Sequence, residues 1–211
     1  MRIVVTRPRE QAPELARRLE ALGHEVVVCP LIEIEAIGDE PIDLSPYDWL
    51  VVTSPNAARE LARRGRGRPA RIAAIGPGTS SALGEAGLPA DLVPVVSTQE
   101  GLLAELPQPA GRVLFAGAED ARRLLADELA ADFVPLYRTR AVRSPATPEG
   151  DLVVLASASA ARAFGALGVA IPAVSIGPLT TEAAREAGVT VLREAATHDL
   201  EGLVEACSSP S

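Results

Sequence analysis

Short apolar runs alternate with amphipathic segments along most of the 211-residue chain. Continuous runs of Val, Ile and Leu are typical of strands that are buried on both faces of a parallel sheet. The segments between them place apolar residues at helical spacing, as Leu15, Leu19 and Leu22 do, with Gly23 after the last turn. The predicted strands are Ile3–Val5, Val26–Cys29, Trp49–Val52, Ile72–Ile75, Leu92–Val95, Val113–Phe115, Leu152–Leu155, Ala173–Ile176 and Val189–Leu192. The predicted helices are Glu10–Leu22, a helix beginning at Pro55, Thr79–Ala86, Gly101–Leu106, Ala121–Leu129, Ala160–Leu167, Thr180–Ala187 and Leu200–Ala206.

The second half of the chain repeats the plan of the first. AAIGPGTSSALGEAGL at Ala73–Leu88 returns 101 positions later as VSIGPLTTEAAREAGV, and eight of 13 positions in its core are identical. The tripeptide Glu-Gly-Leu at 100–102 returns at 201–203, again 101 positions on. Solenoid repeats have periods of about 20–50 residues. The longer period therefore predicts an α/β chain of two similar domains, each a parallel sheet flanked by helices.

Matched polar turns follow four of the predicted strands. Thr79 and Thr180 come after Gly-Pro and are predicted to N-cap their helices, and Ser54 and Ser157 occupy the same kind of turn. Backbone N–H groups and the helix dipole make such turns suitable for anions, and ligands of parallel sheets bind beyond the carboxyl ends of the strands. Two domains facing each other would form a cleft lined by four such turns. The arrangement predicts a ligand with several anionic groups.

The composition of the chain excludes several classes of function. The net charge of −8 opposes nucleic acid as a partner, and the absence of Lys excludes lysine Schiff bases and a P-loop. The basic stretch RRGRGRPAR at Arg63–Arg71 lacks interleaved aromatics, which favours a solvated loop over a phosphate patch. No apolar run is long enough to span a bilayer, and the start MRIVVTRPRE favours a strand over a secretory signal. With Cys29 and Cys207 as reduced thiols, a cytoplasmic location is predicted.

Motifs for cofactors and metals are missing from the sequence. Gly76 and Gly78 are followed by Ser81, so the GxGxxG spacing fails, and there is no HExxH or Cys/His cluster. Neither Ser54 nor Ser157 lies in a GxSxG elbow. The sequence therefore predicts no cofactor and no metal, and a function that depends on binding and shape.

Five segments, in order, resemble the uroporphyrinogen-III synthase family. They are TRP at Thr6–Pro8, YDWLVVTSPNA at Tyr47–Ala57, AAIGPGT at Ala73–Thr79, VPLYRT at Val134–Thr139 and SIGPLT at Ser175–Thr180. The resemblance implies a bilobed fold of two α/β domains joined by a two-stranded β linker. It implies a discontinuous first domain of residues 1–33 and 144–211, a second domain of residues 38–134, and linker strands near 31–37 and 135–143.

The reaction implied by the resemblance closes hydroxymethylbilane, a linear tetrapyrrole with eight carboxylates, to uroporphyrinogen III. Water is lost and ring D is inverted, in heme, cobalamin and siroheme synthesis. The pyrrole nitrogen lone pair expels the hydroxyl, so no cofactor is needed, and positioning and electrostatics would provide most of the catalysis. The implied partner is this substrate, and direct handover from hydroxymethylbilane synthase stays open. The chain is expected to be a monomer.

Matching the family pattern residue by residue gives the candidate site. Tyr137 is expected to assist departure of the hydroxyl as a hydrogen-bond donor or general acid. The expected substrate-binding residues are Arg7, Ser54, Asn56, Thr79, Ser157 and Thr180, with Arg138 as a weaker candidate. The sequence departs from the family where Val52 and Ala156 replace aromatic residues and where SASA lacks a proline, which affects the details of the site.

Two alternatives remain open at this point. The chain could be a non-catalytic bilobed module that binds a small anion, or a synthase-like domain that has lost activity and serves regulation. The presence of Tyr137 and of both Gly-Pro-x-Thr turns favours the enzyme over a degenerate domain.

Overall fold

The computed structural model describes residues 1–143 and 145–208 of the chain. These residues form two compact units, of which unit 1 comprises Met1–Glu33 and Thr139–Ser211 and unit 2 comprises Ile34–Arg138. The predicted first-domain boundary at residue 144 and the end of the tail, 209–211, lie outside the described residues. The short polar run at residues 208–211 predicts a disordered tail, but Ser208 is the last residue of helix α8.

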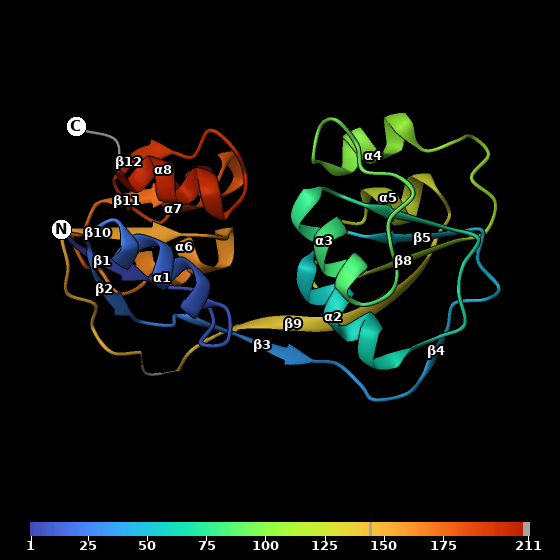
Figure 1. The fold of residues 1–211 in the computed structure, drawn as a ribbon, viewed down its shortest axis with the longest axis horizontal. Helices are drawn as coiled ribbons and strands as arrows, with labels where there is room; N and C mark the ends of the chain where they lie inside the picture. The colour runs from blue at the N-terminus through green and yellow to red at the C-terminus, as the bar shows by residue number, and fades with distance from the viewer. Residues whose placement is uncertain (144, 209–211) are drawn as a thin grey trace. The chain divides into compact units, whose positions relative to one another are not determined.

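Unit 1 is built on a five-stranded parallel sheet (Figure 1). The strand order is β12-β11-β10-β1-β2. Its strands are β1 (Arg2–Val5), β2 (Glu25–Val28), β10 (Leu152–Leu155), β11 (Ala173–Ser175) and β12 (Val191–Glu194). Its helices are α1 (Ala12–Ala21), α6 (Ala158–Gly165), α7 (Pro178–Glu186) and α8 (Leu200–Ser208).

Unit 2 repeats this plan around a second sheet, of order β3-β9-β8-β5-β7. Strands β9, β8, β5 and β7 are parallel to one another, whereas the backbone bonds of β3 to β9 follow an antiparallel register. The strands are β3 (Ile32–Ala36), β5 (Trp49–Val52), β7 (Arg71–Ala74), β8 (Val113–Ala118) and β9 (Asp132–Ala141), with a short pair β4 (Ile42–Asp43) and β6 (Gly65–Arg66). The helices are α2 (Pro55–Arg64), α3 (Pro77–Glu85), α4 (Gln99–Glu105) and α5 (Leu124–Glu128).

Strands β3 and β9 carry the chain from one unit to the other. The first boundary falls within β3, between Glu33 and Ile34, and the second falls within β9, between Arg138 and Thr139. The two strands are neighbours in one sheet, and the amide N–H of Ile37 donates to the carbonyl of Leu136 at 2.9 Å. The domain and linker bounds implied by the family resemblance stay a prediction.

The apolar runs are buried on both faces of each sheet, as their composition predicts. In β1, Ile3 and Val5 pack into one apolar cluster with α1 and α8, and Val4 packs into another with α6 and α7. All four residues of β10 and all four of β5 are buried. Because helices cover both faces, the polar turns at the strand ends remain the places where a ligand can approach the sheet.

The prediction of a strand at Leu92–Val95 is wrong. Only Leu92 forms a bridge, to Ala73, and Val95 is 93% exposed. Asp91 explains why the segment still follows the sheet edge, since its carboxylate accepts from the amide N–H of Ile72 at 2.8 Å.

Three arginines of the basic stretch Arg63–Arg71, which begins at the end of α2, make contacts within unit 2. Arg64 is buried and donates to the carbonyls of Ile37 and Glu40, and Arg63 pairs with Asp39. Arg66 donates to backbone carbonyls of its own turn. These contacts give the stretch a structural role, but the prediction of a solvated loop is wrong in part, because Arg64 is buried and the stretch includes the end of α2, β6 and the start of β7.

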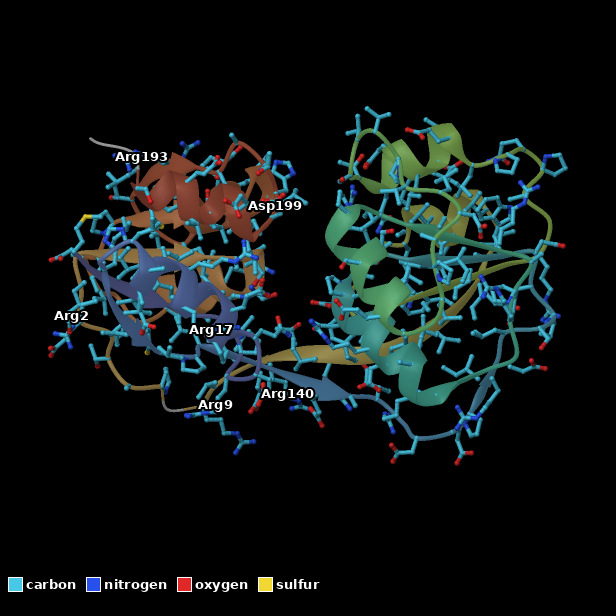
Figure 2. All side chains as sticks on the ribbon, viewed as in Figure 1. Arg2, Arg9, Arg17, Arg140, Arg193 and Asp199 are labelled. Atoms are coloured by element: carbon cyan, nitrogen blue, oxygen red, sulfur yellow. The ribbon has the colours of Figure 1, made fainter. Side chains whose placement is uncertain are left out.

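Charged side chains lie on the outside of unit 1, as Arg9 and Arg17 show in Figure 2. Among the helices of the described residues, none has the length and apolar character to cross a membrane.

Candidate functional site

The two Gly-Pro-x-Thr turns begin helices α3 and α7, but the threonines are not the caps. Gly76 and Gly177 are the N-cap residues, prolines occupy the first helical turn, and Thr79 and Thr180 lie inside that turn. The prediction that the threonines N-cap is therefore wrong. Their side chains are 3% and 5% exposed, so they pack within their own units.

Ser54 and Ser157 N-cap the helices that follow them, as expected for these turns. Ser54 Oγ accepts from the amide N–H of Ala57 at 3.1 Å, and Ser157 Oγ accepts from that of Ala160 at 3.2 Å. Both serines are in extended backbone conformation and half-buried. Each follows a fully buried strand, so a side-chain oxygen and the start of a helix meet at the carboxyl edge of each sheet.

Tyr137 and Ser54 are in direct contact within unit 2. The Tyr137 hydroxyl donates to Ser54 Oγ at 2.9 Å, although 83 positions separate them. Tyr137 lies in β9 and Ser54 follows β5, and β8 lies between these two strands in the sheet. The tyrosine side chain therefore extends over the carboxyl end of β8 to reach the serine.

The hydroxyl of Tyr137 is a protonated donor in this setting. Burial raises the pKa of Tyr137 above its ordinary value of 10.0, because the phenolate would lose its hydration. Bonds to Ser54 and Asn56 oppose this rise in the Tyr137 pKa, and the charge of Asp120 adds to it. The side chain is only 6% exposed. A phenol held in this way can donate a hydrogen bond or a proton at neutral pH.

The remaining predicted residues lie at the carboxyl edges of the two sheets but differ in the contacts that their side chains make. Arg7 follows β1, is half-buried and donates from Nη2 to Gln11 Oε1 at 3.2 Å. Asn56 Oδ1 accepts from Arg59 Nη1 at 2.9 Å. Arg138 pairs with Glu35 at 3.4 Å and Glu119 at 3.8 Å, so two carboxylates already balance its charge.

The structure thus brings Tyr137, Ser54 and Asn56 together in unit 2. Thr79 belongs to the same unit, on α3, whereas Arg7, Ser157 and Thr180 belong to unit 1. The predicted site residues are therefore divided between the two units, and those of each unit follow strands of its own sheet.

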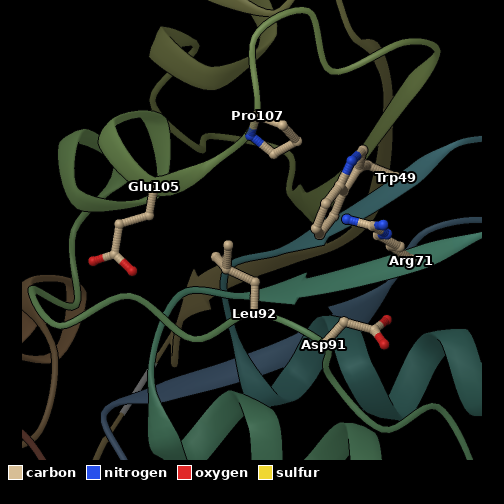
Figure 3. A pocket seen from close by; sticks show the side chains of 6 residues that line it. All are labelled: Trp49, Arg71, Asp91, Leu92, Glu105 and Pro107. Atoms are coloured by element: carbon tan, nitrogen blue, oxygen red, sulfur yellow. The ribbon is translucent and has the colours of Figure 1, made fainter.

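A cavity of about 560 Å³ lies at the opposite edge of the sheet of unit 2 (Figure 3). Trp49 and Arg71 line it and are the first residues of β5 and β7, so the cavity lies at the amino ends of these strands. It contains none of the predicted site residues. Within residues 1–143 and 145–208, no group of three or more His, Cys, Asp or Glu side chains is placed to hold a metal ion.

Sequence reasoning missed one further contact at each Gly-Pro turn. A Cβ on Gly76 would lie 2.7 Å from Ser97 Oγ, and a Cβ on Gly177 would lie 2.9 Å from His198 Cδ2. Ser97 and His198 are also 101 positions apart. The 101-residue period, which also relates the two Glu-Gly-Leu tripeptides, is the signal that pairs them, although serine and histidine are different residue types.

Comparing Ser54→Ala with Ser157→Ala isolates the tyrosine contact. Each change removes an N-cap, which costs about 1 kcal/mol. Ser54→Ala also leaves the buried Tyr137 hydroxyl without its acceptor, at a further cost of about 1–2 kcal/mol. We expect denaturant unfolding to show Ser54→Ala as the more destabilised variant by that amount. Equal losses would mean that the Tyr137 hydroxyl finds another partner at no cost.

The profile of the family described as uroporphyrinogen-III synthase HemD matches residues 13–205. A putative uroporphyrinogen-III synthase of Methanocaldococcus jannaschii is 30% identical over 149 residues, covering 66% of this chain and 62% of that protein. A porphyrin biosynthesis protein HemD of Ruminiclostridium josui is 30% identical over 220 residues, covering 88% of this chain and 44% of that protein. The chain therefore spans less than two thirds of the length of these curated relatives.

Solved structures show the same fold. A uroporphyrinogen-III synthetase from Helicobacter pylori matches with a TM-score of 0.68 at 20% identity, covering 98% of both chains. A mutant uroporphyrinogen III synthase from Thermus thermophilus matches with a TM-score of 0.61 at 20% identity, covering 97% of this chain and 96% of that one. The fold class predicted from the sequence is confirmed by these likenesses and by the parallel strands of the two sheets, which helices flank. The family profile covers nearly the whole chain, and the chain belongs to the uroporphyrinogen-III synthase HemD family.

Proposed function

We propose that this chain is a uroporphyrinogen-III synthase, a cyclising lyase that converts hydroxymethylbilane to uroporphyrinogen III with loss of water and inversion of ring D. The observation that carries the proposal is the buried Tyr137 hydroxyl, held 2.9 Å from Ser54 at the carboxyl edge of a parallel sheet. Family membership supports the same reaction.

Substrate recognition follows from the polar turns. The eight carboxylates of the bilane need N–H and O–H donors spread over a wide surface, and each unit offers helix starts at the carboxyl edge of its sheet. Arg7 and Asn56 add side-chain donors. We propose that Ser54, Asn56 and Thr79 in unit 2, and Arg7, Ser157 and Thr180 in unit 1, form the substrate-binding set, with the threonines acting from inside the first helical turns.

Tyr137 would assist the departure of the hydroxyl. The C–O bond of the hydroxymethyl group breaks, the electron pair leaves with oxygen, and the Tyr137 proton converts the leaving hydroxide to water. The pyrrole nitrogen supplies the electrons that replace the broken bond. Because burial raises the pKa of Tyr137, its proton is retained at neutral pH until the leaving group needs it.

The raised pKa of Tyr137 predicts an alkaline limit to activity. The rate of ring closure should be flat on the alkaline side up to about pH 10 and fall only above it, when the phenol loses its proton. Between the unfolded and folded pKa values the folded state holds more protons, so stability also falls as pH rises through that window. A pH–rate profile with circular dichroism at each pH checks this, with Tyr47→Phe as the control that keeps the profile. A fall centred near neutral pH would contradict the role of Tyr137.

A non-catalytic anion-binding module is the competing function, because the same turns would bind any multiply charged anion. Hydroxymethylbilane closes by itself, so the rate at which freshly made bilane disappears separates the two. A synthase speeds its disappearance in proportion to protein concentration, at protein concentrations far below that of the bilane. A binding module slows it or leaves it unchanged.

The remaining expectations belong to the same proposal. The enzyme would act as a cytoplasmic monomer without a cofactor, with hydroxymethylbilane synthase as the source of its substrate. Sedimentation of the chain at assay concentration tests the monomer.

A further inference from the structure

Two acidic residues follow the strand over which Tyr137 extends. Strand β8 ends at Ala118, and Glu119 and Asp120 come directly after it. Ala118 is paired with Tyr137, and the amide N–H of Glu119 donates to the Tyr137 carbonyl at 2.8 Å. Since the tyrosine side chain then passes over the end of β8 toward Ser54, the first residues after β8 lie beside its path.

The two carboxylates have different surroundings. Glu119 lies 3.8 Å from the guanidinium of Arg138, which balances its charge. Asp120 is exposed, and no ion pair of Asp120 is found within residues 1–143 and 145–208. Its charge reaches the hydroxyl of Tyr137, since it contributes to raising the pKa of that phenol. An unbalanced negative charge thus stands at the edge where the substrate is proposed to react.

An acidic group is unexpected beside a site for a substrate with eight carboxylates. It repels the substrate in the ground state, so it does not serve binding. The reaction, however, creates positive charge. When the C–O bond breaks and oxygen leaves with the electron pair, the pyrrole nitrogen lone pair forms a C=N bond. The ring becomes a cation, and the proton from Tyr137 completes the departing water.

We propose that Asp120 stabilises the pyrrole cation that forms when the hydroxyl leaves, through the position of its carboxylate at the end of β8 beside Tyr137. This inference rests on the proposed synthase function. The carboxylate exchanges no proton in this step. It acts on the charge that develops in the transition state, and this is the kind of interaction that raises kcat without improving substrate binding.

Asp120→Asn tests the proposal, with Glu128→Gln as the matched control. Glu128 is an exposed residue of unit 2 in α5, so its replacement removes the same charge from the same unit. We expect Asp120→Asn to lower kcat about tenfold while KM stays constant or falls, because a repulsive charge is gone. Glu128→Gln should keep the wild-type kcat. A purely structural role of Asp120 would instead raise KM and lower the unfolding midpoint.

Asp120→Glu provides the second variant, since it keeps the charge and should restore most of kcat. The proposal is overturned if Asp120→Asn keeps the wild-type kcat, or if Asp120→Glu is as slow as Asp120→Asn. A chain that forms no type III isomer at all would instead contradict the proposed function.

A measurement made without substrate distinguishes failure of the Asp120 proposal from failure of the proposed synthase function. The chain has only two tyrosines, so ¹³C-labelled tyrosine gives two ring signals, and Tyr47→Phe identifies the one from Tyr137. In Asp120→Asn the pKa of Tyr137 should fall, because a neighbouring negative charge is removed. An unchanged titration of Tyr137 would contradict the placement of Asp120 whether or not the chain is active.

Discussion

Tyr137→Phe lowers the rate of type III formation by about 100-fold or more, which is the usual contribution of a general acid. The phenylalanine fills the same buried space, and Ser54 keeps its bond from the amide N–H of Ala57, so the fold remains. Only the donor is lost. KM should change little, because the hydroxyl acts on the leaving group and not on the carboxylates that bind the substrate. Initial rates at varied bilane concentration give both constants.

Tyr47→Phe is the matched control for this variant. Tyr47 donates to Asp132 at 3.0 Å and lies outside the candidate site, so its replacement should leave the rate unchanged. If Tyr137→Phe kept the rate of the wild type, positioning of the bilane alone would account for catalysis, and the donor role would be wrong.

Gly101→Ala and Gly202→Ala should each destabilise the chain by about 2–3 kcal/mol. A Cβ on Gly101 would overlap the carbonyl oxygen of Val96, and a Cβ on Gly202 would overlap that of Thr197. Both contacts are to backbone, which cannot move aside as a side chain would. These glycines let each helix approach the turn before it, so that the following leucines, Leu102 and Leu203, reach the core. Urea unfolding gives the free energy of each variant.

Gly84→Ala is the control for this pair. Gly84 lies in helix α3, and nothing lies within 4 Å of the Cβ that the change adds. It should therefore stabilise the helix by about 0.5–1 kcal/mol, since alanine has the higher helix propensity. If Gly101→Ala or Gly202→Ala were also neutral or stabilising, steric demand would not explain why the Glu-Gly-Leu tripeptide occurs twice.

The strands could be predicted because their apolar runs serve both faces of a sheet. In β10 every residue is buried, so the sequence there leaves no choice but a covered strand. The segment Leu92–Val95 carries apolar residues too, but it follows Pro89, contains Pro94 and lies at a sheet edge. Proline has no backbone N–H to donate to a neighbouring strand. A segment at the sheet edge also has a strand on one side only, so fewer hydrogen bonds hold it in the sheet.

Caps were harder to predict than helices. Ser54 and Ser157 were predicted correctly because a proline or a small residue follows them at the first helical position. In the Gly-Pro-x-Thr turns the proline also marks the first turn, which places the cap at Gly76 and Gly177 and the threonines three residues inside. Residue type alone favours threonine as the cap, whereas the proline at the first helical position makes the preceding glycine the cap.

The contact between Tyr137 and Ser54 could not be predicted from the residues themselves. It depends on β8 lying between β5 and β9, and strand order is a property of the whole sheet. The same holds for Asp120, which no motif marks. Both residues of the contact were available from the family resemblance, but their geometry came only from the fold.

The isomer composition of the porphyrin products shows directly whether this chain inverts ring D. Fresh hydroxymethylbilane is incubated with the chain, the products are oxidised, and the porphyrin isomers are separated by chromatography, with a sample without protein in parallel. We expect type III in clear excess with the chain present and type I alone without it. Type I alone in both samples, from a folded chain, would contradict the claim that this protein inverts ring D.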